Sequence, residues 1–300
     1  MKTDYYLGVC EEGFHRIAYT EWGTPSSSHT PLICVHGLTR NRRDFDHLAN
    51  YLSEREFHLF CPDIVGRGDS DWLNNPLHYT FEQYIADCNV MISRIHTQEI
   101  DWVGTSMGGI IGMALASLPN SPIRRLILND VGPQIQLKGL TRLMLQVGSH
   151  PYFSTIEQAI LYHKQTLPDL GNLTEAQWQE ISENSIYETK PGIFTLKFDP
   201  KIKTTSLKSK MAWSSVLHPH KALEGVLFDV ELWEIWETVK CPVLIIRGKK
   251  SDILSMSTVD RMKRGHIHVD VIEIPDAGHA PALLDPEQHE MIYQWLKKTY

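Results

Sequence analysis

The sequence has no long apolar segment of the kind that inserts into a membrane. No run approaches the roughly 18 apolar residues that a membrane-spanning helix needs. The first eight residues, Met1 to Gly8, also lack the apolar core of a secretory signal. We therefore expect a cytoplasmic protein that makes no membrane contact.

Cysteine pairs and metal-binding motifs are equally scarce. The five cysteines are odd in number and dispersed, and none has Cys-x-x-Cys spacing, which indicates reduced thiols rather than a disulfide framework. The fifteen histidines include no His-Glu-x-x-His motif. The two close pairs, His218/His220 and His266/His268, have no acidic or thiol companion nearby. We expect no metal site and no cofactor.

Basic residues are fewer than acidic ones, with 29 Lys and Arg against 36 Asp and Glu. The formal net charge is −7 and the isoelectric point is near 6.1, which gives no electrostatic reason to expect a nucleic-acid partner. With 42% hydrophobic residues, the 300-residue chain can bury a sizeable core as one large α/β domain or as a core that carries an inserted lobe. Either a monomer or a homodimer fits this composition.

Short apolar runs alternate with helical patterns over most of the chain. Residues 32–35, 57–61, 100–103, 123–128 and 242–248 are typical of strands buried on both faces of a parallel sheet. From about 133 to 239 the patterns are helical instead, with capping-box motifs at Ser154 and Thr174. The sequence therefore predicts an α/β core over 1–132 and 240–300, with a mainly helical insertion over 133–239.

One strand-to-helix junction carries a glycine-bracketed serine. Gly104-Thr105-Ser106-Met107-Gly108 follows an apolar strand and opens an apolar helix, as the Gly-x-Ser-x-Gly nucleophile elbow does. A side chain at Gly104 or Gly108 would obstruct the turn or the contact between helix and strand. We therefore take Ser106 as a candidate nucleophile.

Further polar residues follow the other predicted strands. In a parallel sheet, catalytic groups gather beyond the carboxyl ends of the strands, where this sequence has Ser106, then Asp130 and Asp252, then His279. A serine hydroxyl needs a base to take its proton as it attacks, and histidine has a suitable pKa. A carboxylate behind the ring fixes its tautomer. The backbone N–H groups of Leu38 and Met107 are candidates to stabilise a developing oxyanion.

These blocks together resemble the α/β-hydrolase-fold serine hydrolases with an inserted cap. The matching blocks are His36-Gly37, Asp63-Ile64-Val65-Gly66-Arg67-Gly68-Asp69-Ser70, Gly104 to Gly109, Ser251-Asp252 and Gly278-His279. The resemblance spans 31–130 and 240–298 and makes residues 133–239 the variable cap. It implies that Ser106 is the nucleophile, His279 the base and Asp252 the acid. Asp130 is the alternative acid, because some family members place the acid one strand earlier.

The same resemblance suggests roles for the residues around this site. We expect His36 to order its loop by hydrogen bonding, and Asp63, Arg67 and Asp69 to form a hydrogen-bonded turn. Arg42 and Arg43 are either surface charges or contacts for an anionic substrate group. Five cap residues are candidates to line an apolar acyl pocket, with cap-core packing as the alternative: Met144, Leu145, Trp213, Trp233 and Trp236.

The expected activity is hydrolysis of a carboxylic ester of a small to medium acyl substrate through an acyl-enzyme. The segments 36–46 and 128–133 are similar to hydrolases linked to 3-hydroxybutyrate oligomers, so such esters are one candidate substrate. Two alternatives stay open. One is carbon–carbon bond hydrolysis of ring-fission dienones, although those relatives usually carry Asn where Thr105 stands. The other is a non-hydrolytic ligand-binding member of the fold.

Overall fold

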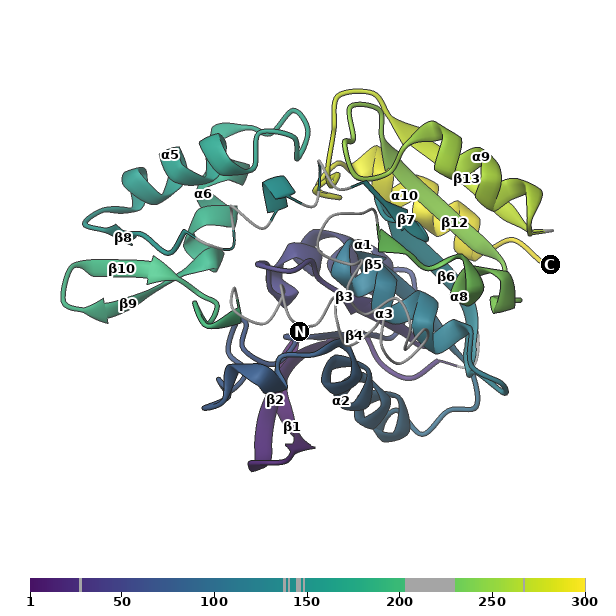
Figure 1. The fold of residues 1–300 in the computed structure, drawn as a ribbon, viewed down its shortest axis with the longest axis horizontal. Coiled ribbons are helices and arrows are strands. Elements are labelled where there is room, and N and C mark those ends of the chain that lie inside the picture. The colour runs from purple at the N-terminus through teal and green to yellow at the C-terminus, as the bar shows by residue number, and fades with distance from the viewer. Residues whose placement is uncertain are drawn as a thin grey trace.

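The computed structural model describes residues 1–26, 29–136, 139, 141–143, 147, 149–202, 230–266 and 268–299. An eight-stranded sheet forms its centre, in the order β1-β2-β4-β3-β5-β6-β12-β13 (Figure 1). The first strands, β1 and β2, pair antiparallel with each other, and β2 pairs antiparallel with β4, whereas β4 to β13 pair in parallel. The strands of this sheet are β1 (Lys2–Cys10), β2 (Gly13–Trp22), β3 (Leu32–Val35), β4 (Leu59–Pro62), β5 (Ile100–Thr105), β6 (Ile123–Asn129), β12 (Val243–Gly248) and β13 (Val269–Ile274).

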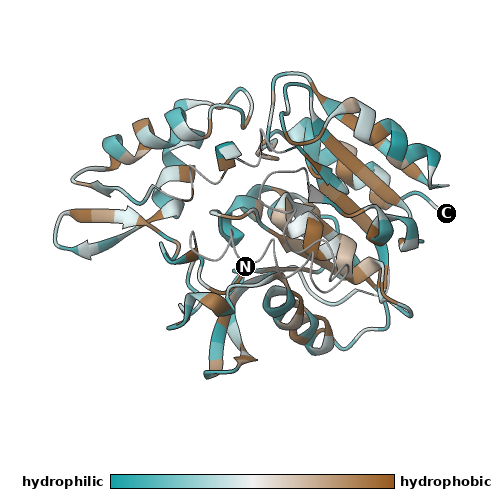
Figure 2. Ribbon diagram, in the orientation of Figure 1, coloured by the Kyte–Doolittle hydropathy of each residue, from teal (hydrophilic) through white to brown (hydrophobic). Residues whose placement is uncertain are grey.

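The short apolar runs became the central strands because both of their faces are covered. Every residue of β3, β4 and β12 is buried. Along β12, Val243 and Ile245 join the core on one face of the sheet, while Leu244 and Ile246 join the core on the other. This double burial explains why the sequence of these strands is continuously apolar rather than alternating. Figure 2 shows the same concentration of hydrophobic residues along β12.

Helices cover both faces of the sheet. Buried side chains of α1 and α10 belong to one core, and those of α2, α3, α8 and α9 belong to the other. Thr80 and Asp285 are the N-caps of α2 and α10, since each side chain accepts a backbone N–H of the helix that follows. The helices are α1 (Asp46–Ser53), α2 (Phe81–Arg94), α3 (Met107–Ala116), α8 (Trp233–Thr238), α9 (Met256–Arg264) and α10 (Pro286–Leu296), with 3-10 turns η1 (Arg42–Phe45) and η2 (Pro76–His78).

A second group of elements lies beside the sheet, at the left of Figure 1. It contains helices α5 (Ile156–Thr166) and α6 (Glu175–Ser185) and a small sheet of β8 (Tyr152–Phe153), β10 (Ile193–Leu196) and β9 (Ile186–Lys190). We call residues 152–196 the side lobe. Thr174 makes the predicted capping box with Gln177, whereas the cap of α5 is Thr155 rather than Ser154.

The two ends of the predicted insertion pack differently from the side lobe. Strands β7 (Gln134–Ile135) and β11 (Val230–Glu231) pair antiparallel with each other, which joins the start and the end of the insertion. Helix α8 contacts α3 of the core. The boundaries 1–132, 133–239 and 240–300 stay a prediction. In the part of the chain that the structure describes, no helix is both long enough and apolar enough to cross a membrane.

Candidate active site

The strand β5 ends in a sharp turn that lifts Ser106 out of the sheet. Ser106 has φ 51° and ψ −112°, a conformation that L-residues rarely adopt. The neighbouring glycines make this turn possible. A Cβ at Gly104 would lie 2.3 Å from the carbonyl carbon of Gly108, and one at Gly108 would lie 2.1 Å from the Val35 carbonyl oxygen. The turn therefore requires glycine at both positions, as the sequence pattern predicted.

The side chains of Ser106, His279 and Asp130 form a hydrogen-bonded chain. The Ser106 Oγ lies 2.9 Å from His279 Nε2. The other ring nitrogen, Nδ1, lies 2.8 Å from Asp130 Oδ2. These residues come from the ends of β5 and β6 and from the loop after β13. The structure thus brings together two of the predicted residues, Ser106 and His279, with the alternative acid.

The prediction that Asp252 holds the His279 ring is wrong. Both Asp252 oxygens accept hydrogen bonds from the Arg142 guanidinium, at 2.6 and 2.7 Å. This hydrogen bonding lowers the pKa of the Asp252 carboxyl below its usual range. Asp130 reaches His279 instead, because its backbone has a positive φ of 53° at the end of β6. The loop after β6 and the ion pair with Arg142 therefore decide which carboxylate contacts the imidazole.

Two residues that hold this arrangement were given no role of their own from the sequence, although Ser251 stands in one of the matching blocks. The Ser251 hydroxyl donates to Asp130 Oδ2 at 2.5 Å and accepts the backbone N–H of Leu254 at 3.0 Å. The Asn129 amide donates to Thr105 Oγ1 at 3.1 Å and to the Pro281 carbonyl at 2.9 Å, which joins the elbow to the histidine loop. Their one sequence signal is position, since each directly precedes a candidate acid at the end of a strand.

The backbone beside Ser106 offers N–H donors from two loops. Met107 is the first residue of α3, so its N–H belongs to the positive end of the helix dipole. Neither the Leu38 nor the Met107 N–H donates a backbone hydrogen bond to any residue that the structure describes. A Cβ on Gly37 would lie 3.8 Å from the Ser106 Cβ, so the loop passes close to the serine. This geometry is compatible with the predicted oxyanion hole.

His36 orders the loop that contains Leu38, as predicted. Its Nδ1 donates to the Gly37 carbonyl at 2.7 Å, and its Nε2 accepts the Ile64 N–H at 2.9 Å. Burial is the main cause that lowers the pKa of His36 to about 3, so the ring is neutral at physiological pH.

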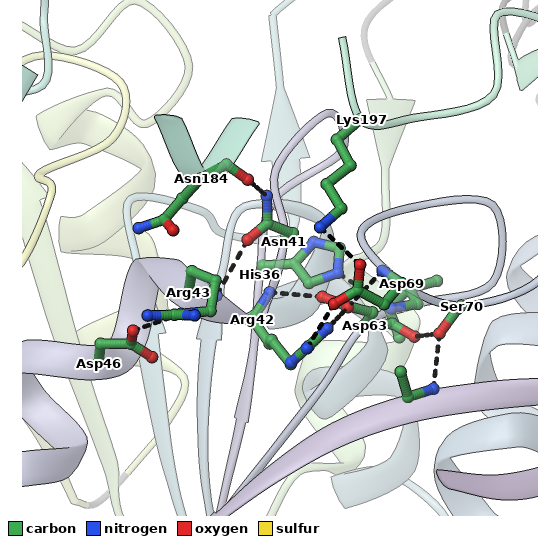
Figure 3. A network of polar contacts seen from close by, with 12 residues as sticks. His36, Asn41, Arg42, Arg43, Asp46, Asp63, Asp69, Ser70, Asn184 and Lys197 are labelled. Carbon is green, nitrogen blue, oxygen red and sulfur yellow. Dashed lines mark hydrogen bonds and ion pairs between the residues drawn. The ribbon is translucent and has the colours of Figure 1, made fainter. Parts of the chain in front are cut away.

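The turn over residues 63–70 is a dense polar network (Figure 3). Asp63 accepts hydrogen bonds from the backbone N–H groups of Arg42 and Asp69, and its side chain pairs with the Arg42 guanidinium. Arg42 is 5% exposed and also pairs with Asp69, so it is a buried ion-pair partner and not a surface charge. Arg43, by contrast, pairs with Asp46 and lines the cavity described next.

A cavity opens beside Ser106 between the core and the side lobe. Its lining includes Ser106 and His279 together with apolar and charged side chains. The apolar ones include Leu38, Phe45, Leu143, Leu167, Leu170 and Ile181. The polar ones are Thr39, Arg40, Arg43, Asp44, Thr105, Glu180 and Asn184.

The predicted pocket residues do not line this cavity where the structure describes them. Trp233 and Trp236 are 7% and 1% exposed and pack in the core through α8. The Arg261 guanidinium lies 3.7 Å from the centre of the Trp233 ring. The alternative of core packing is therefore correct for both tryptophans. Met144, Leu145 and Trp213 lie outside the described residues.

The side lobe also holds the loop that carries His279. The Gly278 N–H donates to the Asp169 carbonyl at 2.7 Å, and the Ala282 N–H donates to the Leu170 carbonyl at 3.0 Å. These two bonds flank His279 on either side. The position of the imidazole therefore depends on the side lobe as well as on the sheet.

The fold and this site define the class of protein. Residues 32–290 match the model of the alpha/beta hydrolase family, and the chain belongs to that family. It is a hydrolase of this superfamily, as the resemblance implied.

Three individual proteins show which hydrolases and solved structures the chain is similar to. The chain is 38% identical over 283 residues to the 3-hydroxybutyrate-oligomer hydrolase of Cupriavidus necator, covering 93% of this chain and 92% of the relative. A crystal structure from Rickettsia typhi superposes with a TM-score of 0.87 at 31% identity, over 100% of both chains. An alpha/beta hydrolase from Novosphingobium aromaticivorans superposes with a TM-score of 0.83 at 29% identity, covering 99% of this chain and 98% of the other.

Proposed function

We propose that the protein is a serine esterase that cleaves a carboxylic ester through an acyl-enzyme. The observation that carries this proposal is the hydrogen-bonded chain in which His279 lies 2.9 Å from the Ser106 hydroxyl and 2.8 Å from Asp130. Such a chain is the arrangement that makes a serine hydroxyl reactive near neutral pH.

The reaction begins with attack of Ser106 Oγ on the ester carbonyl carbon. The hydroxyl proton passes to His279 Nε2, and the buried Asp130 carboxylate stabilises the imidazolium. The N–H groups of Leu38 and Met107 donate to the oxyanion that forms. When the tetrahedral intermediate collapses, His279 returns the proton to the leaving alkoxide. Water then attacks the acyl-enzyme with the same proton transfers, which releases the acid and regenerates Ser106.

Short hydroxyacyl esters, such as oligomers of 3-hydroxybutyrate, are the proposed substrates. The relative from Cupriavidus necator, 38% identical, carries that activity in its name. The cavity supports the same class, because it combines apolar walls for a short acyl chain with polar groups such as Asn184 and Arg43 that can bind hydroxyl or carboxylate oxygens. In this proposal no cofactor takes part. Residues 133–239, which include the side lobe, act as the cap over the substrate.

The test measures release of 3-hydroxybutyrate from its linear dimer and trimer, together with hydrolysis of p-nitrophenyl butyrate. We expect the purified protein to cleave both kinds of ester and Ser106→Ala to lower kcat by about four orders of magnitude or more. A fluorophosphonate probe should label Ser106, which peptide mapping identifies without any assumption about the substrate. Ser117→Ala, a serine at the end of α3, is the matched control.

The same assays distinguish the alternatives. Cleavage of a ring-fission dienone, seen as loss of its absorbance, without ester cleavage would replace the esterase with a carbon–carbon bond hydrolase. Ligand binding without turnover, unaffected by Ser106→Ala, would indicate a binding protein.

A further inference from the structure

Arg67 is a fully buried arginine for which the ester chemistry above has no use. Its relative exposure is 0%, and it is one of the largest fully buried side chains of the protein. Within the described ranges, no carboxylate forms an ion pair with it, whereas the neighbouring Arg42 pairs with two. Because a buried charge without a counterion is costly, its position calls for an explanation.

The contacts of the Arg67 guanidinium converge on the two residues of the proposed oxyanion hole. Nε donates to the Leu38 carbonyl at 2.9 Å, and one terminal nitrogen lies 3.8 Å from Met107 Sδ. The other terminal nitrogen donates to the Val65 carbonyl at 2.8 Å. One planar, rigid group therefore links the loop after β3 to the first residue of α3.

Aromatic rings keep the guanidinium in place. Its central carbon lies 4.8 Å from the centre of the Tyr84 ring and 5.9 Å from that of Tyr79. Such rings attract a cation without neutralising it as a carboxylate would. The charge therefore stays uncompensated by a direct counterion close to the place where negative charge develops in the proposed reaction.

We propose that Arg67 is a positioning residue for transition-state stabilisation: it orients the Leu38 and Met107 backbones so that both N–H groups face the oxyanion. This inference rests on the proposed function. Arg67 acts through the Leu38 carbonyl and the Met107 side chain and does not touch the substrate. Its positive charge favours the oxyanion over the neutral ground state. Loss of Arg67 should therefore lower kcat and leave KM nearly unchanged.

The experiment compares Arg67→Met and Arg67→Lys with Arg42→Met, a matched control. Arg42 is buried and anchors the same turn through Asp63 and Asp69 (Figure 3). Among the described residues, none of its hydrogen bonds or ion pairs is with Leu38 or Met107. For each protein, kcat and KM on p-nitrophenyl butyrate, the melting temperature, and the Ki of butylboronic acid are measured. The boronate forms a tetrahedral adduct with the serine and so reports on the oxyanion hole.

We expect Arg67→Met to lower kcat by about ten- to a hundredfold and to raise the boronate Ki by a similar factor, with KM within about threefold. Arg67→Lys, which keeps the charge, should recover part of both losses. Arg42→Met should lower the melting temperature without the rise in Ki.

A boronate Ki in folded Arg67→Met within about threefold of wild type would overturn the inference, as would an equal rise in Arg42→Met. If Arg67→Met does not fold, the boronate Ki of Arg67→Lys is compared with that of wild type instead. A Ki within about threefold of wild type would again overturn the inference. Failure of the proposed function gives a different result: the wild-type protein itself would neither hydrolyse the ester nor bind the boronate.

Discussion

At the scale of single residues, Asp130 shows how a buried carboxylate is held in one orientation. It is 0% exposed, and each of its oxygens has a donor: Oδ1 accepts the Gly248 N–H at 2.8 Å, and Oδ2 accepts from Ser251 and His279. A carboxylate with its oxygens satisfied in this way cannot rotate without losing hydrogen bonds in a dry environment. The His279 ring therefore has a rigid partner.

This geometry predicts that the two candidate acids respond differently to the same substitution. Asp130→Asn keeps the size but removes the charge that fixes the imidazole tautomer, so we expect kcat to fall by about three to four orders of magnitude. Asp252→Asn removes only a partly exposed pair with Arg142, so kcat should change less than about fivefold. Steady-state kinetics on p-nitrophenyl butyrate measures both. If kcat fell further in Asp252→Asn than in Asp130→Asn, the acid of the triad would be Asp252.

At the scale of elements, His36 joins the loops that follow β3 and β4. In the neutral ring both nitrogens are used, since Nδ1–H donates to Gly37 and Nε2 accepts from Ile64. Protonation at Nε2 would turn an acceptor into a donor opposite another N–H group. The neutral ring is therefore part of the connection between the two strands.

The lowered pKa of His36 makes this connection sensitive to acid. Its pKa is about 3 in the folded chain against 6.5 for an unperturbed histidine, so the unfolded chain binds the proton more readily. The contribution of the neutral His36 ring to the free energy of unfolding is complete above pH 6.5 and is lost as the pH falls from 6.5 toward 3. The stability difference between wild type and His36→Gln should therefore shrink by about 1.4 kcal/mol between pH 7.5 and 5.5.

Urea denaturation at the two pH values measures this difference. Leu48→Ala, a fully buried apolar change, is the control and should destabilise the protein equally at both pH values. A difference between wild type and His36→Gln that stays constant or grows at pH 5.5 would contradict the neutral-ring assignment.

At the scale of the whole molecule, buried polar contacts join the core to the chain that leaves the side lobe. Tyr79 is one of them, because its hydroxyl donates to Asp199 at 2.6 Å and accepts the Leu73 N–H at 2.8 Å. Both Tyr79 and Asp199 are almost fully buried. Desolvation and the hydrogen bond to Asp199 raise the pKa of Tyr79, which therefore stays protonated as a donor.

Tyr79→Phe should consequently lower the free energy of unfolding by about 1–3 kcal/mol, since it leaves the buried Leu73 N–H without its acceptor and removes one donor from the buried Asp199 carboxylate. Thermal and urea denaturation measure the loss. Tyr5→Phe, at a residue that is 54% exposed, is the control and should be nearly neutral. Equal stability of the two variants would show that this contact contributes little to the joining of the two parts.

Much of the fold was predictable because its signals are local. The continuous apolar runs at 32–35 and 242–248 predicted buried parallel strands, and the comparisons confirm the α/β-hydrolase fold. The pocket was not predictable in the same way. Trp233 and Trp236 occupy helical positions that suit either a cavity wall or a core, and only the packing of α8 on α3 distinguishes the two.

The sequence by itself determined the elbow, because glycines at 104 and 108 and the strand and helix around them are all contiguous in the chain. It also determined the candidate nucleophile and imidazole, because Ser106 lies in the elbow and Gly278-His279 is one of the blocks that carry the family resemblance. Only the tertiary structure decided between Asp130 and Asp252, because both follow strands that are neighbours in the sheet. That choice depends on a positive φ at Asp130 and on an ion pair between Arg142 and Asp252, which are 110 residues apart.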